Sequence, residues 1–451
     1  MGFLGSSVCL IVRESPAKPR PSIYISRHEG VCVLSAVVNP AWILARPADW
    51  RRGRQGLGAG LHRAAARPDS LGGLRLRQLP NLRFGPANDA VARRRPSEGG
   101  SCLVAYLVEL TEPRVVGIRT YPTPAVGPGE ARVRTLYSGI SAGTEMATYR
   151  GTNPYLAKRW DAELALFRPG EAILAYPVDV WGYSEVGVVE AVGAEVAEPA
   201  IGDVVWGIWG HRSHAVLSTE LLVGHVMPPD LDPKVGTFDR VGAVALNAVL
   251  ASEARIGETI AVFGQGVIGL LATQLLTSQG IQVLAIDTIP SRLALARSFG
   301  ATPFDAGTDD LALALRDHTG GAGPDRVIEL TGAYPALHEA IRVAGVGGTV
   351  IAGGFYQGPA TSLALGEEFH HNRVTLISSQ IGSVPAALRE RWSRERLHQT
   401  VMQLCAAGRL DPLPLVTHVL PAADAATAYA LIDQPPADLL QVILNFTEDA
   451  G

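Results

Sequence analysis

Residues Glu258 to Ala301 read ETIAVFGQGVIGLLATQLLTSQGIQVLAIDTIPSRLALARSFGA, and this stretch decides the fold of the main part of the chain. An apolar run, Thr259 to Phe263, predicts a strand that leads directly into a glycine-rich turn, and the residues that follow to about Ser278 have helical spacing. A second apolar run, Gln282 to Ile286, ends at Asp287. Strand, glycine turn, helix, strand and acid in this order indicate a dinucleotide-binding βαβ unit.

The spacing of the glycines and of the acid predicts how the cofactor is held. Gly264 permits a tight turn, Gly266 lets the backbone approach a pyrophosphate, and Gly269 lets the helix pack closely on the sheet. Asp287 follows the last glycine by 18 residues, where a carboxylate accepts hydrogen bonds from the adenosine ribose hydroxyls. Its charge would repel a 2′-phosphate, so NAD is expected rather than NADP, although Arg292 nearby could soften this preference. The expected cofactor-binding residues are Gly264, Gly266, Val267, Ile268, Gly269, Asp287, Arg292, Thr331 and Gly332.

The alternation of strands and helices continues beyond this unit. DRVIELTG, GGTVIAGGF and RVTLISSQIG are predicted strands, and YPALHEAIRVA is a predicted helix. Together they predict an α/β domain with a doubly wound parallel sheet. Thr331 and Gly332 follow one of these strands, at the carboxyl edge where such sheets bind ligands.

A different pattern precedes the nucleotide domain. Short β segments separated by Gly and Pro, such as ARVRTLYSG, EVGVVEAVGAEV and SHAVLS, predict a partly open antiparallel barrel. A helix near Glu395 to Ala407 and a strand near Leu440 to Phe446 are expected to return to this barrel. We therefore expect an N-terminal extension over 1–102, a β domain over 103–230 completed by about 389–451, and a nucleotide domain over 231–388.

The composition limits the function classes. The chain has 451 residues, 47% hydrophobic and 18% charged, which is typical of a globular protein with a large core. The first hundred residues carry 16 Lys and Arg against 6 Asp and Glu, whereas the remainder carries 23 against 37. An acidic main body without a basic stripe argues against nucleic acid as a partner. No run of 18 or more apolar residues occurs, so no membrane span is expected.

The four cysteines, Cys9, Cys32, Cys102 and Cys405, are widely scattered, without CxxC or Cys/His spacing. This excludes a disulfide framework and the usual zinc motifs, and it favours a reducing compartment. We therefore expect a cytoplasmic protein whose partner is a small-molecule substrate.

The first hundred residues are rich in Arg, Pro and Gly and show no sustained period of 2 or 3.6. We expect a disordered extension, or a start codon assigned too far upstream, that is dispensable for folding and activity. A targeting role is the alternative, because the acid-poor composition also suits a transit peptide and MGFLGSSVCLIV loosely fits a myristoylation or signal pattern.

Several motifs occur in an order that is typical of one enzyme family. They are SGISAGTE (138–145), GYSEVGVVEAVG (182–193), GDVVWG (202–207) and VFGQGVIGLLA (262–272). Over about Val104 to Phe446 the chain resembles the medium-chain dehydrogenase/reductase (zinc alcohol dehydrogenase) superfamily. The first two motifs are similar to the bacteriochlorophyllide hydroxyethyl dehydrogenase branch, which shares a YSGIS.GTE loop. The resemblance implies a GroES-like catalytic domain, a Rossmann domain, an active site in the cleft between them, and a homodimer.

The resemblance also identifies three positions that hold zinc in other members. The first Cys of Cys-Gly-Thr-Asp corresponds to Ala142, the His of Gly-His-Glu corresponds to Tyr183, and the third ligand corresponds to Asp239. A catalytic zinc normally takes three protein ligands and a water, and an alanine methyl and a phenol cannot supply the missing two. We therefore expect a member without zinc.

Hydride transfer to or from a carbonyl carbon needs a group that stabilises charge on the oxygen, and hydrogen-bond donors must do this where zinc is missing. Thr144 matches the family position whose hydroxyl relays the alcohol proton, and Tyr183 occupies the histidine position, so both are candidate catalytic residues. Equally, the threonine could only cap a turn and the tyrosine could only fill space. His211 and His214 flank a strand that could face the cleft, and either could titrate near neutrality.

The leading hypothesis is an NAD-dependent oxidoreductase that interconverts a secondary alcohol and a ketone without catalytic zinc. One alternative is a reductase of an activated carbon–carbon double bond, as among zinc-less quinone and enoyl reductases of the superfamily. Another alternative is a non-catalytic dinucleotide sensor. The retained Thr144 favours catalysis over the sensor.

Overall fold

The structure of the protein is a computed structural model that describes residues 8–14, 22–28, 31–38 and 104–447. The chain divides into two compact units, Met1–Arg83 and Phe84–Gly451, and each is described by itself.

The first unit contains a small sheet that the sequence did not predict. Strands β1 (Val8–Glu14), β2 (Ser22–His28) and β3 (Val31–Val38) pair in the order β1-β3-β2, with β1 parallel and β2 antiparallel to β3. Each strand is a short run rich in Val, Ile and other residues that favour extended backbone. Such runs escape a search for a sustained period. The other residues of the expected extension, 1–102, lie outside the described residues.

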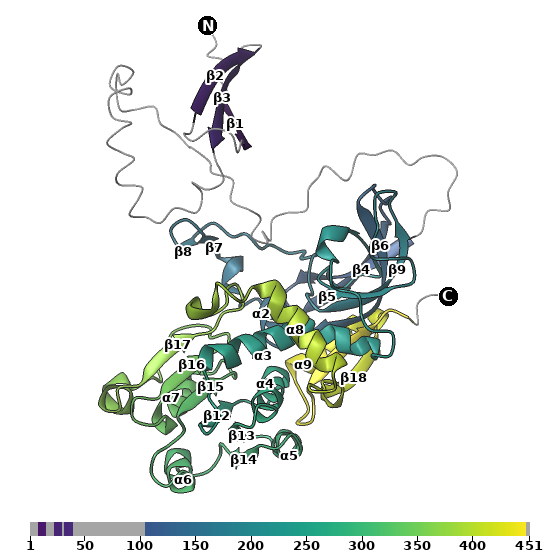
Figure 1. Cartoon of the computed structure of the whole chain (residues 1–451). Helices are drawn as coiled ribbons and strands as arrows, with labels where there is room; N and C mark the ends of the chain where they lie inside the picture. The colour runs from purple at the N-terminus through teal and green to yellow at the C-terminus, as the bar shows by residue number, and fades with distance from the viewer. Residues whose placement is uncertain (1–7, 15–21, 29–30, 39–103, 448–451) are drawn as a thin grey trace, which may run out of the picture. The chain divides into compact units, whose positions relative to one another are not determined.

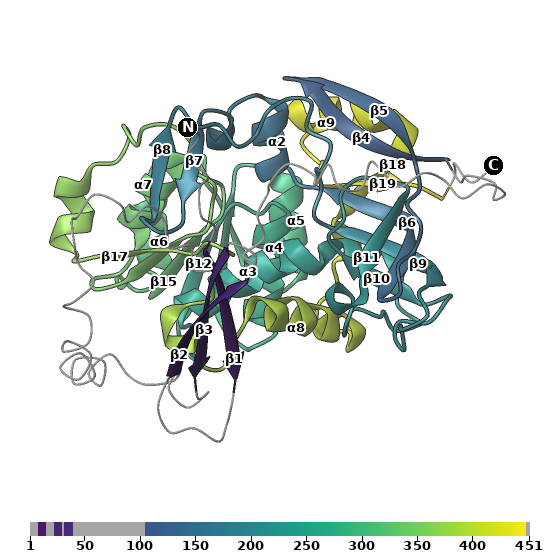
Figure 2. The same cartoon turned by 90° about the horizontal axis from the view of Figure 1, so that it is seen from above.

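A six-stranded parallel sheet forms the nucleotide domain of the second unit (Figures 1 and 2). Its strand order, β14-β13-β12-β15-β16-β17, is that of the Rossmann fold, as predicted. The strands are β12 (Thr259–Phe263), β13 (Gln282–Asp287), β14 (Thr302–Asp305), β15 (Arg326–Glu329), β16 (Thr349–Ala352) and β17 (Thr375–Ser378).

Helices cover both faces of this sheet because alternate strand residues are apolar on both sides. Ile260 and Val262 of β12 pack in one buried cluster with α3, α4, α5 and α8, whereas Ala261 and Phe263 pack in another with α6 and α7. The helices are α3 (Asp239–Ser252), α4 (Val267–Thr277), α5 (Pro290–Ser298), α6 (Leu311–His318), α7 (Tyr334–Val343) and α8 (Arg394–Ala406).

The β domain is built around a second six-stranded sheet, of the GroES-like type. Its order is β10-β9-β6-β19-β18, and β11 also pairs with β6. The strands are β6 (Glu130–Ile140), β9 (Glu185–Val192), β10 (Val204–Gly207), β11 (His214–Ser218), β18 (Val416–Pro421) and β19 (Gln441–Asn445). The C-terminal strand β19 lies antiparallel to β6, so the C-terminal segment of the chain completes this sheet (Figure 2).

Smaller elements complete the described unit. Two hairpins and two short helices accompany the barrel: β4 (Val104–Glu112) with β5 (Val115–Pro122), β7 (Lys158–Asp161) with β8 (Leu166–Pro169), α2 (Thr144–Tyr149) and α9 (Ala425–Asp433). None of the helices found among the described residues has the length and apolar character of a membrane span.

Candidate active site

The glycine-rich turn has the geometry that its sequence predicts. Gly264 has φ +83°, which favours glycine, and α4 begins one residue after Gly266. A Cβ built on Gly269 would lie 1.7 Å from the carbonyl oxygen of Gly264, so no larger residue fits there. A Cβ on Gly266 would meet nothing within 4 Å, which leaves open space beside the first turn of α4. This open space and the free N–H groups of the helix N-terminus suit a pyrophosphate.

Asp287 ends β13 next to this turn. Its Oδ2 accepts a hydrogen bond from the Gln265 backbone N–H at 2.6 Å, and its Oδ1 accepts one from the Ile289 N–H at 2.9 Å. Each carboxylate oxygen keeps a second lone pair for a ribose hydroxyl. Arg292 lies 4.0 Å from Asp287, and its guanidinium donates to the Leu439 carbonyl at 2.9 Å. Arg292 is therefore held toward the C-terminal segment of the chain.

Thr331 and Gly332 lie beside the same turn. The Thr331 methyl is 2.7 Å from a Cβ built on Gly264, so the turns after β12 and β15 touch. Both residues are anchored by Glu329, a fully buried carboxylate that accepts hydrogen bonds from the Thr331 N–H at 2.7 Å and from the Tyr356 hydroxyl. Burial raises the pKa of Glu329. The sequence analysis missed this residue, although an acid at a strand end before Thr-Gly was a usable signal.

The candidate catalytic residues Thr144 and Tyr183 are brought together. The Tyr183 phenol, in the segment before β9, lies close enough to the side chains of Ser141 and Thr144, at the start of α2, for both to lower its pKa. Burial, and then the nearby charge of Glu145, raise the pKa of Tyr183 to about 12. The phenol therefore keeps its proton at neutral pH and can act as a hydrogen-bond donor.

Asp239, the third of the ligand positions, is directed to a different partner. It is buried, and its Oδ2 lies 2.9 Å from His398 Nδ1. The neighbouring Arg240 approaches the other ring nitrogen of His398 at 3.4 Å and lies within electrostatic range of Tyr183. Asp239 Oδ1 is buried without a hydrogen-bond partner, so this carboxylate could still bind a metal. A methyl group at Ala142 and a protonated phenol at Tyr183 supply no further ligand, so the three positions together do not fit a zinc ion. Among the described residues, no three His, Cys, Asp or Glu side chains are grouped to hold a metal.

The two candidate histidines of the sequence differ in their surroundings. His211 is fully buried, with Nε2 2.8 Å from Glu145 Oε2 and Nδ1 2.6 Å from Ser138 Oγ. His214 lies on β11, 3.1 Å from Ser213 Oγ, and burial lowers its pKa. His211 therefore lies directly behind the loop that carries Thr144, and His214 is not part of this cluster.

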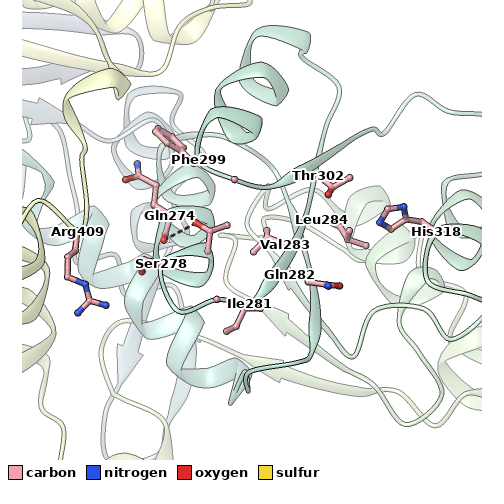
Figure 3. A pocket seen from close by; sticks show the side chains of 13 residues that line it. Gln274, Ser278, Ile281, Gln282, Val283, Leu284, Phe299, Thr302, His318 and Arg409 are labelled. Atoms are coloured by element: carbon pink, nitrogen blue, oxygen red, sulfur yellow. Dashed lines mark hydrogen bonds between the residues drawn. The ribbon is translucent and has the colours of Figure 1, made fainter.

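A cavity of about 700 Å³ lies at the opposite edge of the Rossmann sheet, where β13 and β14 begin (Figure 3). Its lining includes Gln274, whose amide exchanges two hydrogen bonds of 2.9 Å with the backbone of Asp411. The hydroxyls of Thr277 and Ser278 bond to helix carbonyls. Because these polar groups are already satisfied and the glycine turn is at the other edge, this cavity is not the cofactor site.

Comparison with known proteins agrees with this geometry. Residues 267–398 match the family described as "Zinc-binding dehydrogenase". The chain is 28% identical to the D-guloside 3-dehydrogenase of Escherichia coli (strain K12) over 348 residues, which is 74% of this chain and 98% of that protein. Two solved structures are each 20% identical to this chain. One is of a protein from Sinorhizobium meliloti 1021 described as a zinc-binding dehydrogenase, bound to NADP, and the other is of an alcohol dehydrogenase from E. coli CFT073, complexed with NADH. They cover 76% of this chain and 99% of their own, with TM-scores of 0.62 and 0.60.

Two glycine substitutions should separate packing from cofactor binding. Gly269→Ala is expected to destabilise the fold by about 1–3 kcal/mol or more, because its Cβ collides with the Gly264 carbonyl. Gly266→Ala should leave the thermal unfolding midpoint nearly unchanged, because its φ of −74° and its open surroundings accept a methyl group. It should weaken dinucleotide binding, measured by fluorescence titration. Equal losses of stability in both variants would contradict this assignment.

Proposed function

The chain belongs to the medium-chain dehydrogenase/reductase superfamily, and we propose that it is an NAD-dependent oxidoreductase that interconverts a secondary alcohol and a ketone without catalytic zinc. The observation that carries this proposal is the close approach of the Ser141, Thr144 and Tyr183 side chains, in the two segments where other members of the superfamily carry their first two zinc ligands. A hydride donor or acceptor is what a nicotinamide dinucleotide supplies when bound.

The residues of the Rossmann edge fit such a cofactor. Gly266 and the first turn of α4 can receive the pyrophosphate, Asp287 can accept the ribose hydroxyls, and Thr331 and Gly332 border the same turn. These groups come from the βα turns at the carboxyl ends of β12, β13 and β15, which are neighbouring strands in the sheet. They bind and orient the ligand, and the chemistry of proton transfer falls to the β domain.

In the β domain, the Tyr183 hydroxyl can donate a hydrogen bond to a carbonyl oxygen as that oxygen gains negative charge. A donor aimed in this way is typically worth about 2.7–4 kcal/mol in a transition state. Thr144 is exposed at the start of α2 and lies close to the phenol, so it can pass a proton between Tyr183 and solvent. The positive charge of Arg240 opposes the rise in the Tyr183 pKa and so favours release of the proton.

The relatives favour alcohol chemistry over double-bond reduction. The E. coli relative is named for dehydrogenation at position 3 of a D-guloside, and another relative is an L-galactonate-5-dehydrogenase. Both names describe oxidation of a hydroxyl carbon in a sugar derivative. We therefore place the substrate among polyhydroxylated compounds that carry a secondary hydroxyl.

NADH should be preferred over NADPH. The Asp287 carboxylate repels a 2′-phosphate, and Arg292 is bonded to the Leu439 carbonyl rather than free to bind that phosphate. We expect kcat/KM for NADH to exceed that for NADPH by on the order of tenfold or more, equivalent to about 1.4 kcal/mol. Asp287→Ser should narrow the ratio. Comparable efficiencies with both cofactors in the parent protein would count against this role for Asp287.

Zinc should be absent from the purified enzyme and chelators should not inhibit it. Ala142 and Tyr183 offer no ligand at neutral pH, and Asp239 is bonded to His398. Elemental analysis is expected to return far less than one zinc per chain. A stoichiometric zinc content, lost together with activity on chelation, would overturn the proposal of a zinc-independent site.

Tyr183→Phe tests the catalytic phenol directly, because it keeps the ring and removes only the hydroxyl. We expect turnover to fall by about 10²- to 10³-fold, the effect of removing one oxyanion donor, with the Kd for NADH nearly unchanged. Tyr121→Phe is the matched control, since that phenol donates to the His214 carbonyl elsewhere in the barrel. If Tyr183→Phe and Thr144→Val both turn over at close to the parent rate, the proton donor is another residue.

A further inference from the structure

A buried cluster of ionisable groups lies behind the Ser141–Thr144–Tyr183 group. It consists of Glu145, His211 and Glu185, all of which are fully or almost fully buried, together with the hydroxyls of Ser138 and Tyr429. Its members come from β6, α2, the segment before β11, β9 and α9. Because buried charges are costly unless they are paired and hydrogen-bonded, the number of protons shared by these two carboxylates and the imidazole decides whether the cluster is stable.

The hydrogen-bond distances limit where the protons of the cluster can be. Glu145 Oε2 accepts from the Tyr429 hydroxyl at 2.9 Å, so its 2.8 Å contact with His211 needs an N–H on Nε2. Ser138 Oγ lies 3.0 Å from Glu185 Oε1 and 2.6 Å from His211 Nδ1. Serine has one proton to donate. When that proton goes to Glu185, the contact with Nδ1 needs a second N–H on the imidazole.

The backbone hydrogen bonds of Glu185 favour its ionised form and oppose the effect of burial, which raises the pKa of this carboxyl. Its Oε2 accepts the N–H groups of Trp209 at 2.7 Å and Gly210 at 3.1 Å, and such bonds favour a carboxylate. With Glu185 and Glu145 ionised and His211 doubly protonated, every contact in the cluster pairs one donor with one acceptor. If one proton is removed, Ser138 Oγ faces an acceptor without a hydrogen between them. That acceptor is either His211 Nδ1 at 2.6 Å or Glu185 Oε1 at 3.0 Å.

The cluster is in direct contact with the segments that carry the candidate catalytic residues. Glu145 follows Thr144, and its Oε1 accepts the Ser141 backbone N–H at 3.0 Å. Gly182 precedes Tyr183, has φ +99°, and a Cβ built on it would lie 2.8 Å from both His211 Nδ1 and Glu185 Oε1. The backbone before Tyr183 therefore packs directly on the imidazole ring and on the second carboxylate.

From this arrangement we infer that His211 is a positioning residue that acts as an imidazolium, clamped between Glu145 and Glu185, and that it fixes Thr144 and Tyr183 in the geometry needed for proton transfer. The inference rests on the proposed function for its catalytic consequence. It does not rest on that function for the protonation state itself. The buried positive charge replaces no metal ligand and touches no substrate.

The electrostatic surroundings of the imidazole agree with this state. Burial lowers the pKa of His211, but the charge and hydrogen bond of Glu145 and the charge of Glu185 outweigh it and raise the pKa above the ordinary 6.5. Arg212, the next residue, acts in the opposite direction, and Tyr429 presents its ring edge-on at 6.3 Å. Burial also raises the pKa of Glu185.

The raised pKa of His211 has a consequence for stability. A group whose pKa is raised in the folded protein contributes stability that is fully present below its unfolded pKa. That contribution is lost as the pH rises through the folded pKa. For His211 this window starts at about pH 6.5 and extends upward, so alkaline conditions should loosen the cluster.

Glu185→Gln tests the inference because it removes the need for the extra proton. The glutamine amide can donate to Ser138, which then donates to a neutral His211 Nδ1, while the Trp209 and Gly210 N–H groups keep their acceptor. In the parent, kcat for alcohol oxidation should decline on the alkaline side by about tenfold per pH unit above an apparent pKa, as a one-proton limb does. In Glu185→Gln this limb should vanish or move to higher pH, with the Kd for NADH unchanged.

Glu190→Gln is the matched control on the same strand, since Glu190 is partly exposed and contacts Arg134 and His214 outside the cluster. It should keep the parent profile. A parent-like limb in Glu185→Gln would overturn the inference, and so would its loss in Glu190→Gln.

A second measurement needs no turnover. In the full chain labelled with ¹⁵N-histidine, NMR at pH 8 should show a solvent-protected imidazole with N–H protons on both nitrogens, and Glu190→Gln should retain it. Absence of such a signal in the folded parent would overturn the inference even if the protein oxidises alcohols. Its presence in a protein without alcohol or ketone turnover would refute the proposed function and leave the protonation state supported.

Discussion

The hydrogen bond between Glu145 and His211 is the interaction on which the candidate site depends. Glu145 is completely buried, and its carboxylate is bonded to Ser141 in the preceding loop, to His211 before β11 and to Tyr429 on α9. Three segments that are far apart in the sequence therefore meet at one charged group. A buried carboxylate is costly unless all its lone pairs are used, so this requirement fixes the three segments relative to one another.

The barrel and the Rossmann domain are joined by contacts at some distance from this group. Arg292 on α5 donates to the Leu439 carbonyl just before β19, and Gln274 on α4 exchanges two hydrogen bonds with Asp411. The C-terminal segment therefore contacts the nucleotide domain before it enters the barrel sheet beside β6. The turn that carries Asp287 leads into α5, and β19 pairs with β6, the strand that leads to Ser141. The turns proposed to hold the cofactor and the segment next to the Tyr183 phenol are therefore linked through these packed elements.

The Rossmann half was predictable because its signals are local. Gly264, Gly269 and Asp287 lie within one βαβ unit. Gly264 allows the positive φ of the turn, Gly269 allows the helix to approach the Gly264 carbonyl closely, and Asp287 is placed by the end of its strand. The barrel strands were likewise expected, because alternating residues separated by Gly and Pro are read within each segment. The strands of the first unit were not predicted, because the prediction for the first hundred residues rested on the Arg-, Pro- and Gly-rich composition of the whole segment rather than on its short apolar runs.

The cluster behind Tyr183 was not predictable for the opposite reason. Glu145, Glu185 and His211 are separated by 40 and 26 residues, and only the pairing of β6 with β9 and the turn at Gly182 bring them together. Sequence reasoning identified His211 and His214 as equivalent candidates facing a cleft. The structure distinguishes them, because His211 is fully buried against two carboxylates whereas His214 lies on a strand beside Glu190.

A buried imidazolium between two carboxylates is seldom retained for stability alone, because apolar residues of similar volume often serve as well. Its value here lies in geometry. A metal ion holds its ligands by strong directional bonds, and the zinc-independent site that we propose, with Ala142 and Tyr183 at the ligand positions, has no such constraint. The Glu145–His211–Glu185 cluster supplies directional bonds of another kind, at a distance from the substrate. The phenol of Tyr183 can then remain neutral, with a pKa of about 12, and still be held where a hydrogen-bond donor is required.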